Sequence, residues 1–453
     1  MKDTVRILAP CGMLGYGFPK ESFLKGIREN PDAIIVDAGS TDAGPHKLGA
    51  GVSIVSKMAV KKDLELMITH GLNLRIPVII GSAGGSGAKP HVEWTRTIVE
   101  EILNEHKLEA KIAIIWADID KQDIKKAMLL GKTIPLGNSV KSLEPQVLED
   151  TGDVVAQMGH EPIIEALKNK ADIIICGRAY DPSPFAAMGI YYGFDEGLSY
   201  HLGKILECGA LCAEPGTTKD CMLGIIKRDS FIVKSLNPIR KCFTTSVAAH
   251  TFYEKNHPFL LEGPGMVLDL EKCKFTQVEE GIVEVSNSRY RKNDTYYIKL
   301  EGARKVAYRT FVIAGIRDPL LIQRIEEIET LVEEQVREYY SEISTNDYKI
   351  NFYNYGKNAV MGLKETEHFE GHEIGVVFEV IAKTQELAST ICSSIRSTFL
   401  HYGYEGRKST AGNLAFPFAP SDIEFGAVYE FSIYHLMEVE DGLKPFKIEY
   451  LWR

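Results

Sequence analysis

Residues 171–183 read ADIIICGRAYDPS, and the fold is interpreted outward from this stretch. Residues 173–175 form a short β-branched run that glycine and proline then interrupt. Such a run is typical of a fully buried parallel strand that ends in a functional loop. Ligands of open α/β sheets bind outside the carboxyl ends of the strands. Arg178 and Asp181 are therefore either site residues or an Arg–Asp pair that only ties the loop down.

The sequence before this stretch alternates apolar runs with helical patterns. Strands are expected at 5–9, 33–36, 77–80, 111–116, 133–136 and 154–156, and helices at 20–29, 60–70, 91–106, 121–130 and 161–168. Repeated units of this kind predict an α/β fold with a mostly parallel sheet and helices on both faces. After about residue 190 the pattern changes. Residues 199–212 could form one more helix, and short β-like runs, 295–300 and 306–313 among them, dominate from 222 to about 318. A helix at 319–340 and a strand–helix–strand pattern then follow.

The length of 453 residues exceeds that of one ordinary core, so two or three domains are expected. The changes in strand and helix pattern along the chain predict an α/β domain at 1–215 that carries the site. A β-rich second domain that ends in a helix is predicted at 216–345, and a small α+β unit at 346–453. The two later units are expected to complete a cleft or a subunit interface, and we expect a homo-oligomer.

The net charge, the apolar runs and the cysteines limit the expected partners, location and metal sites. The formal net charge is −10 without a basic block, which argues against nucleic acid and anionic membranes as partners. No apolar run reaches the length of a membrane span, and the N-terminus lacks a signal-peptide core, so a cytoplasmic location is expected. Among eight cysteines, Cys208, Cys212 and Cys221 cluster without a C-x-x-C pair. We interpret them as structural thiols, with a metal or redox role as the alternative.

Glycine and polar residues follow the expected strands of the first half. The candidate ligand-binding residues are Gly12, Gly15, Gly17, Ser40, Thr41, Ser82, Gly84, Gly85, Ser86, Gly87 and Asn138. The candidate catalytic residues are Asp37, Asp42, Asp118, Arg178 and Asp181. Because parallel strands end at one edge of a sheet, we expect these residues to meet there.

The glycine loops at 11–17 and 81–87 suit backbone contacts with an anion. Glycine lets amide groups approach a ligand, and a helix N-terminus behind the loop favours negative charge. Neither loop is a P-loop, and the first reads G-x-x-G-x-G instead of the dinucleotide pattern. Asp37 nevertheless lies where a ribose-binding acid would follow the second strand. Phosphate or carboxylate binding, a dinucleotide site and simple tight turns are three open interpretations.

The run 37–46, DAGSTDAGPH, holds two carboxylates and an imidazole. Together with Asp118 and Asp181 it could form an oxygen-rich site for a divalent metal such as Mg²⁺ or Mn²⁺. The same groups could act as general acid and base without a metal. Aspartates also cap helices and turns, which is the structural alternative for each one alone. The cofactor is therefore left open.

Several motifs resemble the acyclic terpene utilisation family AtuA. They are ADIIICGRAYDPS at 171–183, HLGKILECGALC at 201–212, EGPGMVLDL at 262–270 and GNLAFPFAPSDI at 412–423. The resemblance covers most of the chain and implies an α/β protein. It also implies a connection with enzymes that break down branched acyl-CoA compounds, while it supplies no reaction.

The function expected from these observations is a metabolic enzyme of the hydratase, lyase or isomerase type. Its substrate would be a small carboxylic acid or a CoA ester, with proton transfer by the aspartates. Arg178 would hold a carboxylate or phosphate of the substrate. The alternatives are a non-catalytic accessory subunit of a CoA-dependent pathway and a nucleotide-binding oxidoreductase.

Overall fold

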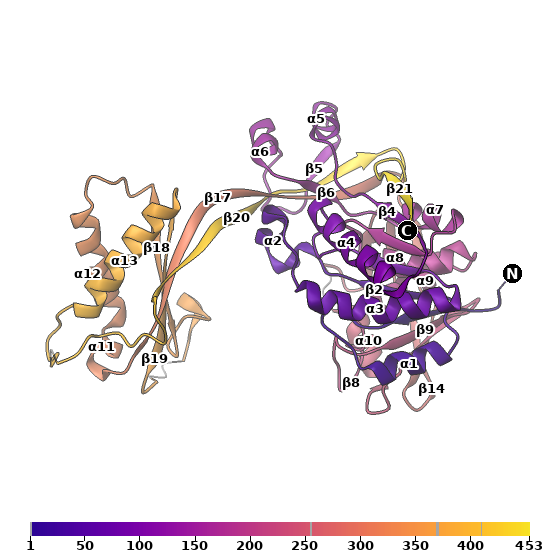
Figure 1. Ribbon diagram of the computed structural model, residues 1–453, viewed down its shortest axis with the longest axis horizontal. Helices are drawn as coiled ribbons and strands as arrows, with labels where there is room; N and C mark the ends of the chain where they lie inside the picture. The colour runs from indigo at the N-terminus through magenta and orange to yellow at the C-terminus, as the bar shows by residue number, and fades with distance from the viewer. Residues whose placement is uncertain (1, 254–255, 368–370, 409) are drawn as a thin grey trace. The chain divides into compact units, whose positions relative to one another are not determined.

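The computed structural model describes residues 2–253, 256–367, 371–408 and 410–453 (Figure 1). It is a mixed α/β protein, which confirms the predicted fold class. The chain forms two compact units, one from residues 1–304 and 431–453 and the other from 305–430. In the described part of the chain, no helix has the length and apolar character needed to cross a membrane.

The first unit is built on a ten-stranded sheet. Its parallel strands lie in the order β1 (Val5–Ala9), β2 (Ala33–Asp37), β3 (Val78–Gly81), β7 (Ile173–Cys176) and β4 (Lys111–Ile115). β7 comes after β4 in the chain but lies between β3 and β4, and it pairs in parallel with both. The 171–183 stretch is therefore an inner strand and its loop, as predicted.

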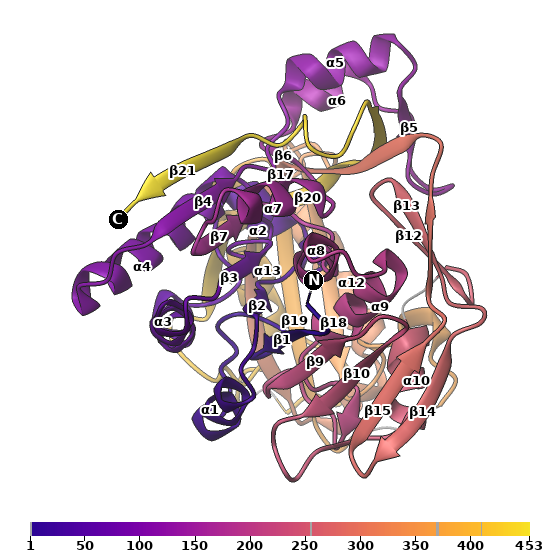
Figure 2. The ribbon, with the colours of Figure 1, turned by 90° about the vertical axis from the view of Figure 1, so that its right-hand side faces the viewer.

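Both faces of the parallel strands are covered, which explains their continuous apolar sequences. Ile173 and Ile175 pack into one core and Ile174 into the other, because side chains alternate along a strand. One face carries α1 (Lys20–Arg28), α3 (Lys57–Leu74) and α4 (Lys89–His106), and the other carries α7 (Glu161–Lys168), α8 (Ser183–Tyr191) and α9 (Glu196–Leu206). Figure 2 shows these two helical layers on either side of the strands.

Antiparallel strands extend the sheet at both ends. Beyond β1 lie β9 (Met222–Ile226), β10 (Ser230–Ser235), β15 (Ile282–Ser286) and β14 (Lys274–Glu279), and beyond β4 lies β21 (Ile448–Trp452). The boundary expected at residue 215 thus lies inside the first unit, since β9 pairs with β1. The chain also returns to this unit after the second one, which the sequence pattern did not indicate.

A second sheet has the order β18, β19, β17, β20 and β5. Its strands are β18 (Tyr348–Tyr355), β19 (Ile374–Ala382), β17 (Tyr296–Ile316), β20 (Asp422–Val439) and β5 (Thr133–Pro135), and β6 (Val154–Ala156) also pairs with β17. Two short runs of the first half therefore belong to this sheet and not to the parallel one. β17 is one long strand where the sequence suggested two short ones.

The second unit packs helices against its strands. These are α11 (Pro319–Gln323), α12 (Ile325–Tyr339) and α13 (Gln385–His401). The single helix expected at 319–340 is divided at Arg324, and the boundary expected at 345 lies within this unit. The other elements are α2 (Pro45–Ala50), α5 (Lys121–Leu129), α6 (Pro145–Asp150), β8 (Ala213–Glu214), β11 (Lys241–Cys242), α10 (Thr244–Phe252), β12 (Leu260–Gly263), β13 (Met266–Asp269), β16 (Arg289–Lys292) and two 3-10 turns at Thr41–Ala43 and Gly362–Lys364.

The glycine loop after β3 packs directly against the loop after β7. Gly87 has a left-handed φ of 65°, and a Cβ added there would lie 2.1 Å from the backbone nitrogen of Arg178. The Arg178 amide also donates a hydrogen bond to the Gly87 carbonyl at 3.2 Å. Glycine at this position is therefore required by backbone contact as well as by conformation.

We predict that Gly87→Ala destabilises the protein much more than Gly131→Ala. Gly131 has a similar φ of 69°, but nothing lies within 4 Å of its added Cβ. The control should cost about 1–2 kcal/mol for the left-handed conformation. Gly87→Ala should cost about 2–5 kcal/mol, because overpacking is added. Urea unfolding measures both, and equal midpoints for the two variants would contradict the close packing.

Candidate functional site

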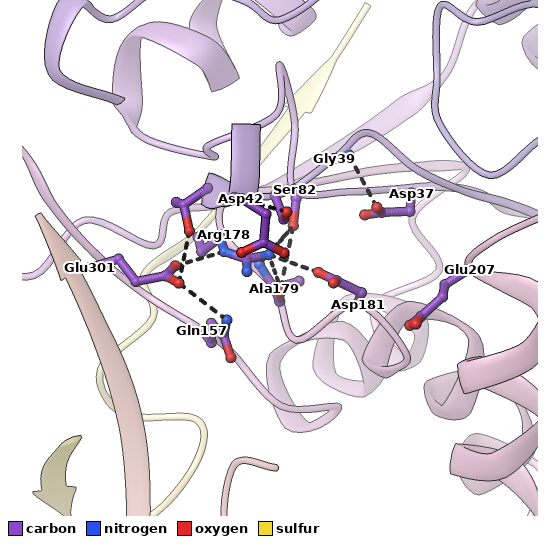
Figure 3. Close-up of polar contacts among 12 residues, drawn as sticks. Asp37, Gly39, Asp42, Ser82, Gln157, Arg178, Ala179, Asp181, Glu207 and Glu301 are labelled. Carbon is purple, nitrogen blue, oxygen red and sulfur yellow. Dashed lines mark hydrogen bonds and ion pairs between the residues drawn. The ribbon is translucent and has the colours of Figure 1, made fainter. Parts of the chain in front are cut away.

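The carboxyl ends of three parallel strands bring predicted residues together. Asp37 ends β2, Ser82 follows β3, and Arg178 and Asp181 follow β7. Figure 3 shows Arg178 in the middle of a polar cluster, with Glu301 on one side and Asp37, Asp181 and Glu207 on the other. The predicted edge of the sheet therefore does carry a group of charged side chains.

The guanidinium of Arg178 is buried and bound on several sides. Its Nε donates to Glu301 Oε2 at 2.8 Å, and its Nη1 donates to Asp181 Oδ1 at 2.7 Å. The same Nη1 contacts Ser82 Oγ at 3.1 Å. The Arg178 side chain is only 3% exposed, whereas that of Asp181 is 30% exposed. Arg178 thus fixes the orientation of Asp181, and Asp181 is the member of the pair that solvent reaches.

Glu301, from β17, is the buried partner that the sequence analysis did not identify. Lys299 Nζ lies 2.8 Å from its Oε1, and Thr41 Oγ1 donates to the same oxygen at 2.9 Å. Burial alone would raise the pKa of Glu301, but the charges of Arg178 and Lys299 outweigh it and lower the pKa to about 2. A glutamate flanked by apolar strand residues was the available signal in the sequence.

Asp37 is in the opposite electrostatic situation. Its Oδ2 accepts a hydrogen bond from the Gly39 amide at 3.1 Å, while its Oδ1 is buried without a hydrogen-bond partner among the described residues. Burial raises the pKa of Asp37 well above its usual range, and the nearby charges of Asp181 and Glu207 raise it further. The charge of Arg178 and the Gly39 amide act in the opposite direction without cancelling this rise, so the environment favours the protonated form of the carboxyl group.

The charges of the cluster agree with this protonation. Four carboxyl groups and three cations meet here: Asp37, Asp181, Glu207, Glu301, Arg178, Lys204 and Lys299. If every carboxyl group were ionised, one negative charge would be left without a cation in a poorly solvated site. Protonation of one carboxyl group balances the cluster, and Asp37 is the member whose surroundings disfavour ionisation most plainly.

Lys204 and Glu207 reach the cluster from the C-terminal end of α9. Lys204 Nζ lies 2.8 Å from Glu207 Oε1, and both side chains are at most 10% exposed. They belong to the segment 201–212 that carries part of the family resemblance, although the sequence analysis gave them no role. Nothing in their spacing indicated that the end of this helix would face the ends of β2 and β7.

A further group lies where α10 meets α9. The His250 and Tyr253 rings pack with centroids 4.8 Å apart, and Tyr253 OH lies 3.2 Å from Cys208 Sγ. Lys204 Nζ sits 4.9 Å from the centre of the Tyr253 ring. His250 and Tyr253 were given no role in the sequence analysis because α10 was not recognised, whereas Cys208 belongs to the cysteine group for which a metal or redox role was the alternative.

Buried polar atoms without a hydrogen-bond partner concentrate around these strand and helix ends. In the described part of the chain they include Asp37 Oδ1, Ser86 Oγ, Tyr180 OH and His250 Nε2. Most buried polar groups of folded proteins have partners, so each such atom needs a water molecule or a ligand. Asp181 and Glu207 both raise the pKa of Tyr180, after burial as the main cause, which places this hydroxyl beside the carboxylates.

Three predicted residues form no hydrogen bond or ion pair with the charged residues of the cluster in the part of the chain that the structure describes. Asp42 is exposed in a short 3-10 turn, where its amide binds Ser40 Oγ at 3.1 Å. Asp118 accepts a hydrogen bond at 3.0 Å from the amide of Lys89, the first residue of α4, and burial raises its pKa to about 6. Asn138 is exposed in the turn after β5 and hence follows a strand of the other sheet.

The glycine loops donate their amides to the protein itself. Gly15 and Gly17 both donate to Asp63 Oδ2, at 2.8 and 3.1 Å, and Gly12 donates to the Thr218 carbonyl. In the second loop the amides of Gly85 and Gly87 bind carbonyls within the loop at 2.9 and 3.2 Å. These contacts support the tight-turn interpretation of the loops, and Asp63 from α3 is a structural residue that the sequence did not reveal.

No set of three or more His, Cys, Asp or Glu side chains in the described ranges is arranged to hold a metal ion. The cysteines there are all free. Cys212 is hydrogen-bonded to Cys242, and Cys221 lies elsewhere, beside Cys11. The cluster that the sequence suggested is therefore divided in the fold.

We predict that Glu301→Gln destabilises the protein by about 3–5 kcal/mol, because it leaves a buried guanidinium short of a charge partner. Since the Glu301 pKa is lowered from 4.5 to about 2, its contribution is complete above pH 4.5 and disappears as the pH falls toward 2. Urea unfolding at pH 7 and pH 3 should show the difference shrinking. Glu280→Gln, which removes an exposed pair with Lys241, should leave the midpoint unchanged.

Comparison with known proteins identifies the family. Neither the curated proteins nor the solved structures gave a significant match. The model of the acyclic terpene utilisation family protein AtuA matches residues 57–416, which include β7, the loop with Arg178 and Asp181, α9, α10 and Glu301. The family's name connects its members with acyclic terpene utilisation. The chain therefore belongs to the acyclic terpene utilisation (AtuA) family.

Proposed function

We propose that this protein is an enzyme that moves protons on a small carboxylic acid or acyl-CoA, in a reaction of the hydratase, lyase or isomerase type. The observation that carries the proposal is Asp37 itself. Its carboxyl group is buried, its pKa is raised, and one of its oxygens has no partner among the described residues. Groups with strongly shifted pKa values gather at functional sites because general acids and bases need such shifts.

Asp37 acts in this proposal as the general acid. A protonated carboxyl group at neutral pH can donate its proton to a carbon or oxygen that gains charge during the reaction. Asp181 and Glu207 keep Asp37 protonated through their negative charges. Arg178 holds Asp181 in place, and we assign it this positioning role because its own guanidinium is almost completely enclosed.

The substrate class follows from proton-transfer chemistry combined with family membership. A hydrogen next to a carboxylate or thioester carbonyl is the hydrogen that an acid–base site can exchange. The family name refers to acyclic terpene utilisation, and an acyl substrate is compatible with that role. The glycine loops do not enter the proposal, because most of their amides are already bound within the protein.

We predict that wild-type protein exchanges the α-hydrogens of an acyl compound with D₂O and that Asp37→Asn slows turnover by about 10²–10⁴-fold. The probes are isobutyryl-CoA, crotonyl-CoA and the two free acids, and mass spectrometry measures deuterium uptake and product. Asp123→Asn, an exposed change on α5, serves as the control. Absence of exchange with all four probes, or full activity of Asp37→Asn, would refute the proposed function.

We also predict that Asp37→Asn is at least as stable as wild type at pH 7, with a gain of about 0.5–2 kcal/mol. A carboxyl group whose pKa is raised by folding destabilises the protein as the pH rises from its usual 3.8 to the folded value. The amide removes that penalty. Asp220→Asn should instead lose stability, because Arg240 and Asn237 both bind the Asp220 carboxylate. Thermal unfolding between pH 4 and pH 8 compares the two variants.

A further inference from the structure

His250 is a buried titratable residue beside Lys204 that has no role in the proposed acid chemistry of Asp37. Its side chain belongs to α10, and the residue is 6% exposed. The ring is held between elements, since it packs on Tyr253 at 4.8 Å and lies beside Lys204 of α9. Most buried side-chain polar atoms of folded proteins have a hydrogen-bond partner, so the unpartnered ring nitrogen of His250 calls for an explanation.

The hydrogen bonds of His250 define which nitrogen can accept a proton. The ring donates one hydrogen bond to the backbone of Lys204, and Nε2 has no hydrogen-bond partner among the described residues. The donating nitrogen is therefore Nδ1, and in a neutral imidazole the other nitrogen then carries a lone pair. Nε2 is thus a buried, unprotonated nitrogen whose lone pair can accept a proton.

The charge of the ring supports the same assignment. Burial, and after it the positive charge of Lys204, lower the pKa of His250 to about 4. The imidazole is consequently neutral at pH 7, whereas the surroundings of Asp37 favour its protonated carboxyl form. Lys204 and Glu207 connect the two residues, because Lys204 acts on His250 and its ion-pair partner Glu207 acts on Asp37. Environments that shift two groups in opposite directions are how an acid and a base are assigned.

We propose that His250 Nε2 is the general base that works with the general acid Asp37. This inference rests on the proposed function. In the step, the C–H bond next to the substrate carbonyl breaks and its proton binds Nε2, while the electron pair stays on the substrate. Asp37 donates its proton to the carbon or oxygen that receives the electron pair. The imidazolium then releases one proton to water, and the Asp37 carboxylate takes one up, so the enzyme is restored.

The test separates the two residues by following exchange and product formation in D₂O with the same four acyl probes. His250→Gln should lose both exchange and product by at least about 100-fold, because no base removes the α-hydrogen. Asp37→Asn should retain exchange at the α-position and lose the product. His435→Gln is the matched control, since His435 is also buried but its Nε2 is bound to the Lys141 carbonyl at 3.0 Å.

A rescue experiment distinguishes a chemical role from a structural one. His250→Ala should regain exchange when imidazole is added, and His435→Ala should show no dependence on imidazole. Circular dichroism checks that each variant is folded, and His250→Asn replaces any variant that is not. Exchange by a folded His250 variant within about threefold of wild type would overturn the assignment of the base while leaving Asp37 untouched. Failure of Asp37→Asn to affect turnover would instead overturn the proposed function.

Discussion

The buried guanidinium of Arg178 is the interaction on which the site depends. It connects the loop after β7 with β17 through Glu301 and with its own loop through Asp181. A buried cation is tolerated only when carboxylates surround it, and here two carboxylates and a hydroxyl do so. The same contacts fix where the Asp181 charge lies. The electrostatic environment of Asp37 is therefore set by a residue that never needs to touch a substrate.

The backbone around Arg178 provides the second constraint. Since β7 is inserted between β3 and β4, the loops after β3 and β7 lie against each other, and Gly87 leaves no room for a side chain beside the Arg178 amide. Parallel pairing of β2 with β3 places Asp37 opposite Gly81. The positions of Asp37 and Glu301 are thus determined by strand register, which is more rigid than a surface loop.

The part of the site that the first half of the chain contributes could largely be predicted from the sequence. Short β-branched runs with turn residues after them identified all five parallel strands, and the shared edge of those strands predicted Asp37, Arg178 and Asp181. The order of the strands could not be predicted, because the periodicity of apolar residues carries no information on the insertion of β7 between β3 and β4. Glu301, Lys204, Glu207 and His250 come from later segments, and only tertiary pairing brings them to the edge.

The predicted residues that form no bond with the cluster show the limit of predicting a site from strand ends alone. Asp118 and Asp42 follow strand or turn signals as Asp37 does, yet one caps α4 and the other is exposed. Asp37 differs from Asp42 in its burial, and it differs from Asp118 in the number of carboxylates that act on it. Asp181 and Glu207, from the loop after β7 and the end of α9, both raise the pKa of Asp37, whereas Asp153 alone does so for Asp118. Burial and several neighbours of like charge act together at Asp37. The unpartnered oxygen of Asp37 is then a cost that folding alone does not explain. A substrate atom that forms a hydrogen bond with Asp37 Oδ1 would remove the cost.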